Sequence, residues 1–249
     1  HGPALRETFD RDIRAFTQLL YETNLIENLP LAPEHEKVAH AAPVEADMRK
    51  DDEKMDLSIF ITEQCNLRCK HCGYVEGKMY DHDLSVAEIQ RIIDQHLALF
   101  PGSTVSFSGG EVTLREDCLE LLEYACARTP KCNFNTNGLL LTPEMAARLA
   151  KTHSWVQISL DGADAEMHNF IRGKGMYERA WRAVEMLAEA GAHKQIVIAC
   201  TLTRGSIEQV KAMVERADRL GIRLLRFLTL NKQRAALTHW DKIAPTHEQ

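Results

Sequence analysis

Three closely spaced cysteines are the residues best suited to chemistry: Cys65, Cys69 and Cys72 form the pattern C-x3-C-x2-C. Three thiolates on one loop can hold one face of a cube-shaped [4Fe–4S] cluster, which usually takes four cysteine ligands. Because no fourth cysteine stands nearby, one iron would remain open to a non-protein ligand. Two alternatives stay open here. Zinc could use His71 as a fourth ligand, although adjacent ligands would strain a tetrahedral site, or the spacing could be coincidental.

Polar and glycine-rich segments follow at intervals: Ser108-Gly109-Gly110-Glu111, Asn135-Thr136-Asn137-Gly138, Ser159-Leu160-Asp161-Gly162, and the stretch from His168 to Arg172 and Gly173. A glycine lets backbone approach a ligand closely because it has no Cβ. Glu111 could pair with an ammonium group, and the planar fork of Arg172 could bind both oxygens of a carboxylate. Three of these segments also have a simpler interpretation: a β/α turn with an exposed Glu111, an ordinary Asn-Gly turn, and a solvated loop charge at Arg172.

Strands alternating with helices are expected to position these segments. The predicted strands cover 57–62, 104–108, 132–135, 155–160, 195–202 and 223–230. The predicted helices cover 85–100, 115–128, 142–151, 177–190 and 206–220, and Ser85 with Glu88 forms a capping box at the first of them. A sixth helix is expected to be missing or barely begun.

This alternation predicts an α/β fold with a parallel sheet and helices outside. Periodicity does not choose between an open doubly wound sheet and a partial barrel. In either case function gathers at the carboxyl ends of the strands. The cysteine motif and the next three segments each follow a predicted strand, so they should meet at one rim.

The cysteine motif followed by Ser108-Gly-Gly-Glu111 resembles the radical S-adenosylmethionine (SAM) superfamily over about residues 57–230. The resemblance implies a partial (β/α)6 barrel and a [4Fe–4S] cluster on Cys65, Cys69 and Cys72. It also implies S-adenosyl-L-methionine, whose amine and carboxylate chelate the open iron. One electron, from a donor such as flavodoxin or ferredoxin, would cleave this cofactor to a 5′-deoxyadenosyl radical that abstracts hydrogen from a substrate.

Ser159-Leu-Asp-Gly162 with the later Arg-Gly is similar to the branch that modifies peptides and proteins, including sulfatase maturases and maturases of ribosomally made peptides. A peptide or protein substrate is therefore expected; a small molecule or RNA, and a zinc-stabilised binding module without catalysis, are the alternatives. The branch implies these cofactor contacts: Ser108, Gly109, Gly110 and Glu111 at the amine, Asn137 beneath the cofactor, Ser159 and Arg172 at the carboxylate, Asp161 near the ribose, and His71, Thr201 and Leu228 at the adenine.

The flanking segments carry weaker signals. Residues 1–28 predict an amphipathic helix, and 29–56 has the composition of a linker. The helix is similar to the last helix of a small winged-helix domain that binds leader peptides, and a plain helix covering the barrel is the alternative. The core is expected over 57–230, and 231–249 would be a tail leading to a missing C-terminal extension that is often rich in cysteines. A core-only member of the family is the alternative to such a larger protein.

Composition narrows the remaining classes. The 249 residues are 45% hydrophobic and carry a net charge of -6 with both signs interspersed, so we expect no nucleic-acid partner. No apolar run approaches the roughly 20 residues that span a bilayer, and no signal peptide is evident, so we expect no membrane association and a cytoplasmic protein. The other cysteines, Cys118, Cys126, Cys132 and Cys200, are interpreted as ordinary core or surface residues.

Overall fold

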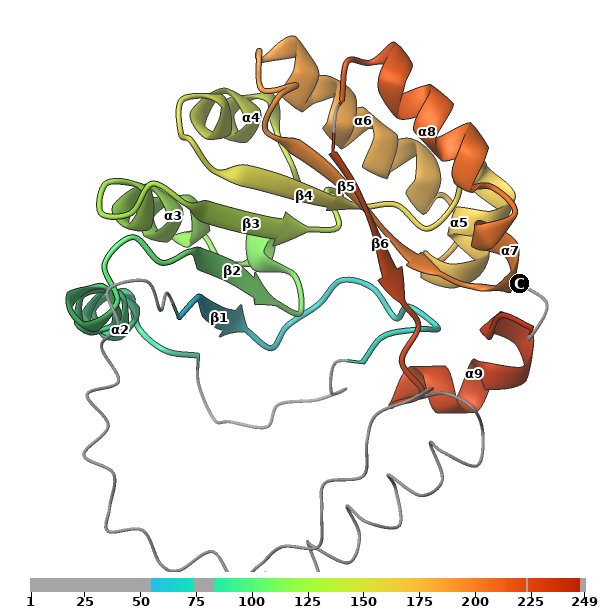
Figure 1. Cartoon of the computed structure of the whole chain (residues 1–249), viewed down its shortest axis with the longest axis horizontal. Coiled ribbons are helices and arrows are strands. Elements are labelled where there is room, and N and C mark those ends of the chain that lie inside the picture. The colour runs from blue at the N-terminus through green and yellow to red at the C-terminus, as the bar shows by residue number, and fades with distance from the viewer. Residues whose placement is uncertain (1–54, 74–82, 223, 247–249) are drawn as a thin grey trace, which may run out of the picture. The chain divides into compact units, whose positions relative to one another are not determined.

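The computed structural model describes residues 55–73, 83–222 and 224–246. They form a parallel sheet of six strands, each paired with its neighbours in chain order (Figure 1). The strands are β1 Leu57–Thr62, β2 Val105–Gly109, β3 Cys132–Thr136, β4 Trp155–Ser159, β5 Ile196–Leu202 and β6 Leu224–Thr229. Sequential order excludes the doubly wound alternative, in which the strand order reverses at a switch point. The expected partial (β/α)6 barrel is therefore confirmed.

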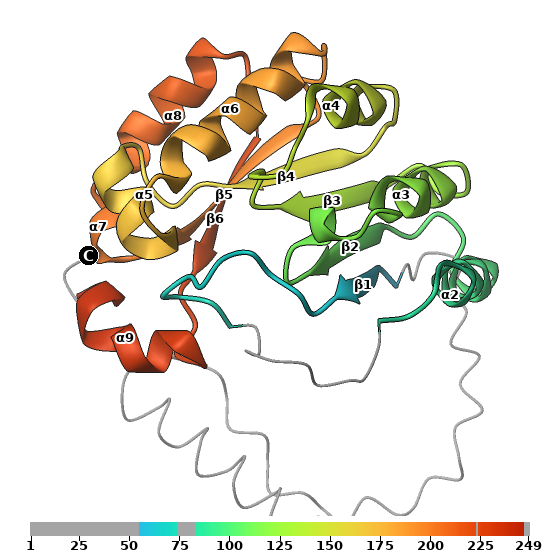
Figure 2. The same ribbon diagram turned by 180° about the vertical axis from the view of Figure 1, so that it is seen from behind.

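Helices lie along the sheet and near the carboxyl ends of its strands. They are α2 Val86–Leu99, the 3-10 turn η1 Val112–Leu114, α3 Cys118–Cys126, α4 Pro143–Ala150, α5 Ala165–Arg172, α6 Met176–Glu189, α7 Arg204–Ile207, α8 Val210–Arg219 and α9 Ala235–Ile243. Figures 1 and 2 show α2, α3, α4, α6 and α8 in one row beside the strands. The capping box at Ser85 and Glu88 is confirmed.

Strand alternation separates a core face from a partly open face. In β2, Val105 and Phe107 are completely buried against the helices, whereas Ser106 and Ser108 are half-buried on the opposite side. The apolar side chains toward the helices provide the main free-energy gain of folding. The other face carries polar side chains from several strands, and at the carboxyl ends these lead directly into the predicted site.

Helix α5 occupies a segment for which no element was predicted. Asp164 caps it by accepting a hydrogen bond from the Met167 amide at 2.8 Å, and Gly173 ends it with φ at 115°. Its buried face consists of His168 and Ile171. The polar residues that made the segment look like a loop therefore belong to a helix, and Arg172 is its last residue.

Helix α9 shows that the expected absence of a sixth helix is wrong. Ala236 and Ile243 bury one face of this helix in a small cluster with Ile171 and Leu230. The predicted helix over 206–220 is also two pieces, α7 and α8, that meet at Glu208 and Gln209.

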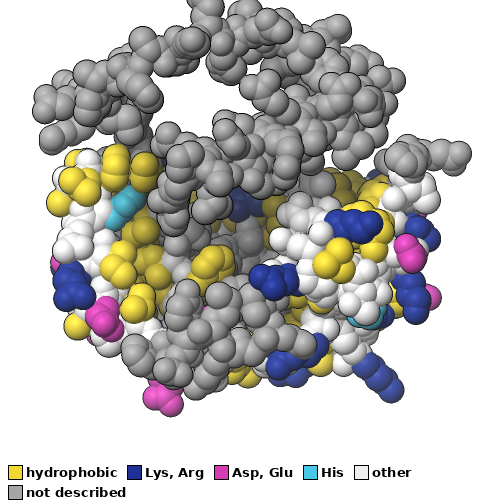
Figure 3. All heavy atoms as spheres, turned by 90° about the horizontal axis from the view of Figure 1, so that it is seen from below, with side chains coloured by type: hydrophobic (Ala, Val, Ile, Leu, Met, Phe, Trp, Pro, Cys, Tyr) yellow, Lys and Arg dark blue, Asp and Glu magenta, His cyan; other side chains and the backbone are white. Residues whose placement is uncertain are grey.

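Residues 1–54, with the expected N-terminal helix and most of the linker, lie outside the described residues. Within the part that is described, no helix has the length and apolar character needed to cross a membrane. On the face shown in Figure 3, lysine and arginine side chains stand in separate groups rather than in a continuous stripe.

Candidate functional site

The loop that carries the cysteines passes directly against the end of β2. The amide of Gly110 donates to the Thr62 carbonyl at 2.9 Å, and the amide of Glu111 donates to the Gln64 carbonyl at 2.8 Å. A Cβ on Gly109 would lie 2.3 Å from the oxygen of Thr62, and one on Gly110 would lie 2.2 Å from that of Gln64. The close approach expected at these glycines is thus made by the chain's own cysteine loop.

The far end of the loop is held by two later helices. The Lys70 amide donates to the Ile171 carbonyl at 2.9 Å, and the ammonium of Lys70 lies 3.4 Å from the ring centroid of Phe170. At the loop's end, the Ala235 amide at the start of α9 donates to the Cys72 carbonyl at 3.3 Å. Because β2, α5 and α9 all contact the loop, the tertiary fold determines where its thiols stand.

The three thiols differ in burial. Cys69 is buried, whereas Cys65 and Cys72 are half-buried. Burial raises the pKa of the Cys65 thiol and raises that of Cys69 to about 11. Within the described residues these sulfurs do not form a group whose members all lie within 4.8 Å of one another. Four sulfurs around one tetrahedral zinc would stand roughly 3.8 Å apart, given a Zn–S distance of about 2.3 Å.

The ring of His71 is engaged elsewhere. Its Nε2 lies 2.6 Å from Oδ2 of Asp161, whose side chain is completely buried. This hydrogen bond leaves Nδ1 as the ring nitrogen of His71 that could meet a metal ion. The wide spacing of the three sulfurs favours a cluster, in which the ligands bind separate irons, over a single zinc ion.

Asp161 and Arg172 form a buried ion pair behind the cysteine loop. Nε of Arg172 donates to Oδ2 of Asp161 at 2.5 Å, and Nη1 of Arg172 lies 3.9 Å from Sγ of Cys69. Burial by itself would raise the pKa of Asp161, but the positive charge of Arg172 and the hydrogen bond from His71 hold it well below its usual range. Arg172 is therefore not the solvated loop charge considered above.

Two further groups complete the surroundings of Asp161. Its Oδ1 accepts a hydrogen bond from the Thr201 amide on β5 at 2.8 Å, and its own amide donates to Nδ1 of His168 at 3.2 Å. Both carboxylate oxygens thus have partners within the protein. The expected contact between Asp161 and a ribose stays a prediction, since the observed contacts are those of a residue that orients Arg172 and His71.

Glu111 is buried rather than exposed. Its Oε1 accepts hydrogen bonds from the Thr113 amide at 3.1 Å, the Thr113 hydroxyl at 2.6 Å and the Thr136 hydroxyl at 2.5 Å. Its Oε2 accepts one hydrogen bond, from the Asn137 amide at 2.7 Å. The interpretation as a turn with an exposed Glu111 is therefore wrong, and this carboxylate joins the ends of β2 and β3.

Asn137 links the β3 end to the cysteine loop. Its Nδ2 donates to Oδ1 of Asn66 at 2.8 Å, and its Oδ1 accepts from the Leu139 amide at 3.0 Å. Gly138, with φ at 80°, allows the tight turn that follows. Asn66 was not predicted, although its place between two of the cysteines was a usable signal. His168 belonged to a recognised motif, but the sequence carried no sign of its burial.

Ser108, Ser159 and Leu228 stand apart from this network. Ser108 and Ser159 lie half-buried near the carboxyl ends of β2 and β4, and neither hydroxyl has a hydrogen-bond partner within the described residues. Leu228 is 40% exposed on β6. The structure thus joins His71, Glu111, Asn137, Asp161 and Arg172 around the cysteine loop, and it leaves the two serine hydroxyls free to meet a ligand.

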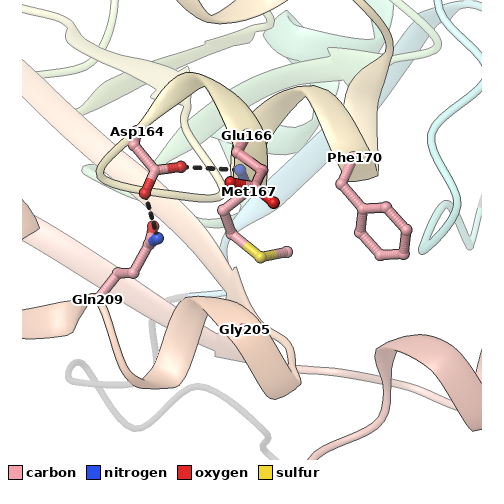
Figure 4. A pocket seen from close by; sticks show the side chains of 6 residues that line it. All are labelled: Asp164, Glu166, Met167, Phe170, Gly205 and Gln209. Carbon is pink, nitrogen blue, oxygen red and sulfur yellow. Dashed lines mark hydrogen bonds between the residues drawn. The ribbon is translucent and has the colours of Figure 1, made fainter.

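A surface pocket of about 360 Å³ lies between α5 and α7 (Figure 4). It is lined by Asp164, Glu166, Met167, Phe170, Gly205 and Gln209. None of the cysteines or expected cofactor-binding residues lines it, so it is distinct from the rim site.

A six-stranded partial barrel with a cysteine loop at its strand ends defines the class of protein to which this chain belongs. A model of the radical SAM superfamily matches residues 59–217, and the chain therefore belongs to that superfamily of enzymes. The resemblance inferred from the cysteine and Ser-Gly-Gly-Glu motifs is confirmed.

Two named relatives show how much is shared. The mycofactocin maturase MftC of Mycolicibacterium smegmatis is 40% identical over 190 residues, which are 76% of this chain and 48% of the relative. An AdoMet-dependent heme synthase of Nitratidesulfovibrio vulgaris is 35% identical over 168 residues, 65% of this chain and 44% of that protein. The chain spans about half the length of the curated relatives it matches.

Solved structures agree on the fold. SuiB of Streptococcus suis bound to S-adenosylmethionine matches with a TM-score of 0.67 at 21% identity, over 78% of this chain and 44% of SuiB. SuiB bound to its precursor peptide SuiA matches with a TM-score of 0.67 at 21% identity, over 99% of this chain and 56% of that one.

Proposed function

We propose that this chain is the radical SAM core of a peptide maturase, in which Cys65, Cys69 and Cys72 hold a [4Fe–4S] cluster and the strand ends bind S-adenosyl-L-methionine. The observation that carries the proposal is the cysteine loop fixed to β2, α5 and α9 at the rim of a partial barrel. Bound together, cluster and cofactor would supply one-electron cleavage of a sulfonium C–S bond and hydrogen abstraction from the substrate. The half-length match means that the substrate and partners of the whole protein are part of this proposal.

The donor set around the loop fits such a pair of ligands. Three thiols supply three ligands, and the C-x3-C-x2-C loop leaves one iron for the cofactor's amine and carboxylate. The guanidinium of Arg172 faces the Cys69 sulfur and keeps its Nη2 free of partners within the described residues. That fork suits a carboxylate bound at the open iron.

We assign the remaining contacts from the free groups at the rim. Oε2 of Glu111 has a single protein donor and can accept a second hydrogen bond from the cofactor's ammonium. The unpartnered hydroxyls of Ser108 and Ser159 can donate to its carboxylate or ribose. His71 is assigned to the adenine side through its backbone, because its ring is bound to Asp161. Gly109, Gly110 and Asn137 shape the wall, and Leu228 would flank the adenine.

Two of the similar proteins favour a peptide substrate. MftC is a maturase, and SuiB has been solved with a precursor peptide. The heme synthase at 35% identity favours a second candidate, in which the same hydrogen abstraction acts on a small molecule. In both cases the electron would come from a small donor protein such as a flavodoxin or ferredoxin, and we propose a cytoplasmic location.

Anaerobic reconstitution tests the chemistry. The brown chain should hold about four irons and release 5′-deoxyadenosine from S-adenosylmethionine on addition of dithionite. Cys65→Ala, Cys69→Ala and Cys72→Ala should each abolish release, whereas Cys200→Ala, a buried cysteine on β5, should retain it. Unchanged release in any of the three variants would contradict the proposal.

Isotope transfer tests the substrate. A candidate precursor peptide encoded beside the gene, synthesised with deuterium on its side chains, should transfer deuterium into 5′-deoxyadenosine. Transfer from a deuterated porphyrin, the class of molecule indicated by the heme synthase relative, without transfer from any peptide would select the small-molecule candidate.

A further inference from the structure

Three potential metal ligands meet at a place that the proposed function does not use. Cys126 is the last residue of α3, Cys132 is the first residue of β3, and His153 lies just before β4. Their ligand atoms all lie within 4.8 Å of one another. Cys132 is buried, Cys126 is half-buried and His153 is exposed, so the group reaches from the core to the surface. No short sequence motif links the three residues.

The ring of His153 has a hydrogen-bond partner of the kind that supports a metal ligand. Its Nε2 lies 2.8 Å from the carbonyl oxygen of Thr129. Because a carbonyl only accepts, Nε2 must carry the hydrogen, and the neutral ring then has its lone pair on Nδ1. Metal-binding histidines usually donate their second ring nitrogen to a carbonyl or carboxylate in this way.

The turn between α3 and β3, which separates Cys126 from Cys132, is also held in place. The Thr129 hydroxyl in turn donates to the Ser103 carbonyl at 2.6 Å, which fixes the turn that presents the carbonyl to His153. Hydrogen bonds to backbone carbonyls therefore hold both the His153 ring and the turn that joins the two cysteines.

This group lies at the opposite end of the sheet from the cysteine loop. Cys132 opens β3, whereas Thr136 closes it at the rim and bonds Glu111. Four residue steps along a strand correspond to about 13 Å. The group therefore stands apart from the rim ligands, and it can be tested separately from them.

We propose that Cys126, Cys132 and His153 bind one zinc ion, with water in the fourth position. Two thiolates and an imidazole are the ligands that zinc prefers, and soft sulfur ligands disfavour magnesium or calcium. Glu123, the acidic group one helical turn before Cys126, is held by Arg148 through two hydrogen bonds of 2.9 Å each, so it is not the fourth ligand. The exposed side of His153 leaves room for water there.

The expected role of the ion is structural. It would join the end of α3 to the starts of the paired strands β3 and β4. A ligand that binds only the folded chain raises its stability by mass action. Zinc should therefore raise the Tm of the wild-type chain and leave the cleavage chemistry at the rim unchanged.

The test uses the full chain with its iron–sulfur cluster loaded, so that zinc cannot occupy Cys65, Cys69 and Cys72. After incubation with zinc sulfate and gel filtration, elemental analysis should find about one zinc per chain beside unchanged iron. X-ray absorption at the zinc edge should show two sulfur ligands at about 2.3 Å and nitrogen or oxygen ligands at about 2.0–2.1 Å.

Variants identify the ligands. Cys126→Ser and His153→Gln should weaken zinc affinity by more than the roughly 10–100-fold typical of outer-sphere groups. Cys118→Ser and His193→Gln, a buried cysteine and a half-buried histidine outside the group, should keep it. Because His153 is exposed, its variant should fold even if a Cys132 variant does not. The triple alanine variant of the rim cysteines should lose iron and keep zinc.

Three outcomes would overturn the proposal. The first is a wild-type chain that retains no zinc after gel filtration, and the second is equal zinc retention in the ligand variants and in the wild type. The third is a Cys126–Cys132 disulfide, found by alkylation and mass analysis in anaerobically prepared, zinc-free chain. The last result would assign the pair to redox chemistry instead.

Discussion

The Nε of Arg172 and the Oδ2 of Asp161 lie 2.5 Å apart, with side-chain exposures of 11% and 0%. This pair joins the last turn of α5 to the segment after β4, and the guanidinium also faces the Cys69 sulfur. The guanidinium of Arg172, which can bind a cofactor carboxylate, is therefore oriented by the completely buried carboxylate of Asp161. The first prediction follows from this burial.

Asp161→Asn should lower the free energy of unfolding by about 3–5 kcal/mol, because it leaves a buried guanidinium without its countercharge. Urea unfolding of the chain before cluster loading measures this. Asp117→Asn is the matched control: Asp117 pairs with Arg115 at 2.6 Å but is 28% exposed, so about 1 kcal/mol is expected. Equal losses in the two variants would contradict the account. The double variant Asp161→Leu/Arg172→Met should regain stability but not cofactor binding.

Stability should fall with acid in a window set by His168. Burial and the nearby charge of Arg172, together with His71, lower the pKa of His168 to about 4, against the opposing charge of Asp161. Below the ordinary histidine pKa of about 6.5, the unfolded chain binds the proton first. The contribution of His168 to the free energy of unfolding is thus fully present above about pH 6.5 and is lost as the pH falls toward 4. At about 1.4 kcal/mol per pH unit, the loss amounts to about 3 kcal/mol.

Urea unfolding at several pH values checks this dependence. His168→Asn keeps an acceptor for the Asp161 amide but does not titrate in this window, so its stability should change much less between pH 6.5 and 4. An identical slope in wild type and variant would assign the dependence to other groups. The lowered pKa of Asp161 acts at more acidic pH, since its contribution is lost only below about pH 4.

Gly110→Ala should reduce cluster retention to less than half of the wild-type iron. A Cβ there would lie 2.2 Å from the Gln64 carbonyl oxygen, which belongs to backbone and cannot swing aside, so the cysteine loop must move. Gly191→Ala is the control: it is strained by a φ of 87° but meets no atom within 4 Å. It should cost about 1–2 kcal/mol and keep its iron. Full iron content in Gly110→Ala would show that the loop tolerates displacement.

Glu111→Gln should weaken S-adenosylmethionine binding at least tenfold, as expected for loss of a charge-assisted hydrogen bond of about 1.5–3 kcal/mol. It should also lower stability, because the amide nitrogen cannot accept the donors that now reach the carboxylate. Thr136→Val serves as the comparison, since it removes one of those donors and keeps the charge. If both variants bound the cofactor equally well, Glu111 would have no role in cofactor binding and would only join the ends of β2 and β3.

Sequence patterns predicted the architecture well because hydrophobic alternation and capping residues are local signals. The six strands and most helices were found within a few residues of their observed bounds. Helices α5 and α9 were missed for a common reason. Each buries little apolar surface, and polar residues such as Asp164, His168 and Asn169 in α5 resemble loop composition until their tertiary partners are known.

For the site, too, the sequence predicted some features and the tertiary structure determined the others. The types and spacing of Cys65, Cys69 and Cys72 favoured a cluster, since ligand chemistry depends on which atoms one short loop can offer. The family resemblance also needed Ser108-Gly-Gly-Glu111 after the second strand. Only the tertiary structure showed that Asp161 forms a buried ion pair with Arg172 and that Glu111 joins two strand ends. The same holds for the convergence of Cys126, Cys132 and His153. Burial and long-range contact arise only when distant segments pack, and no local pattern of residues records them.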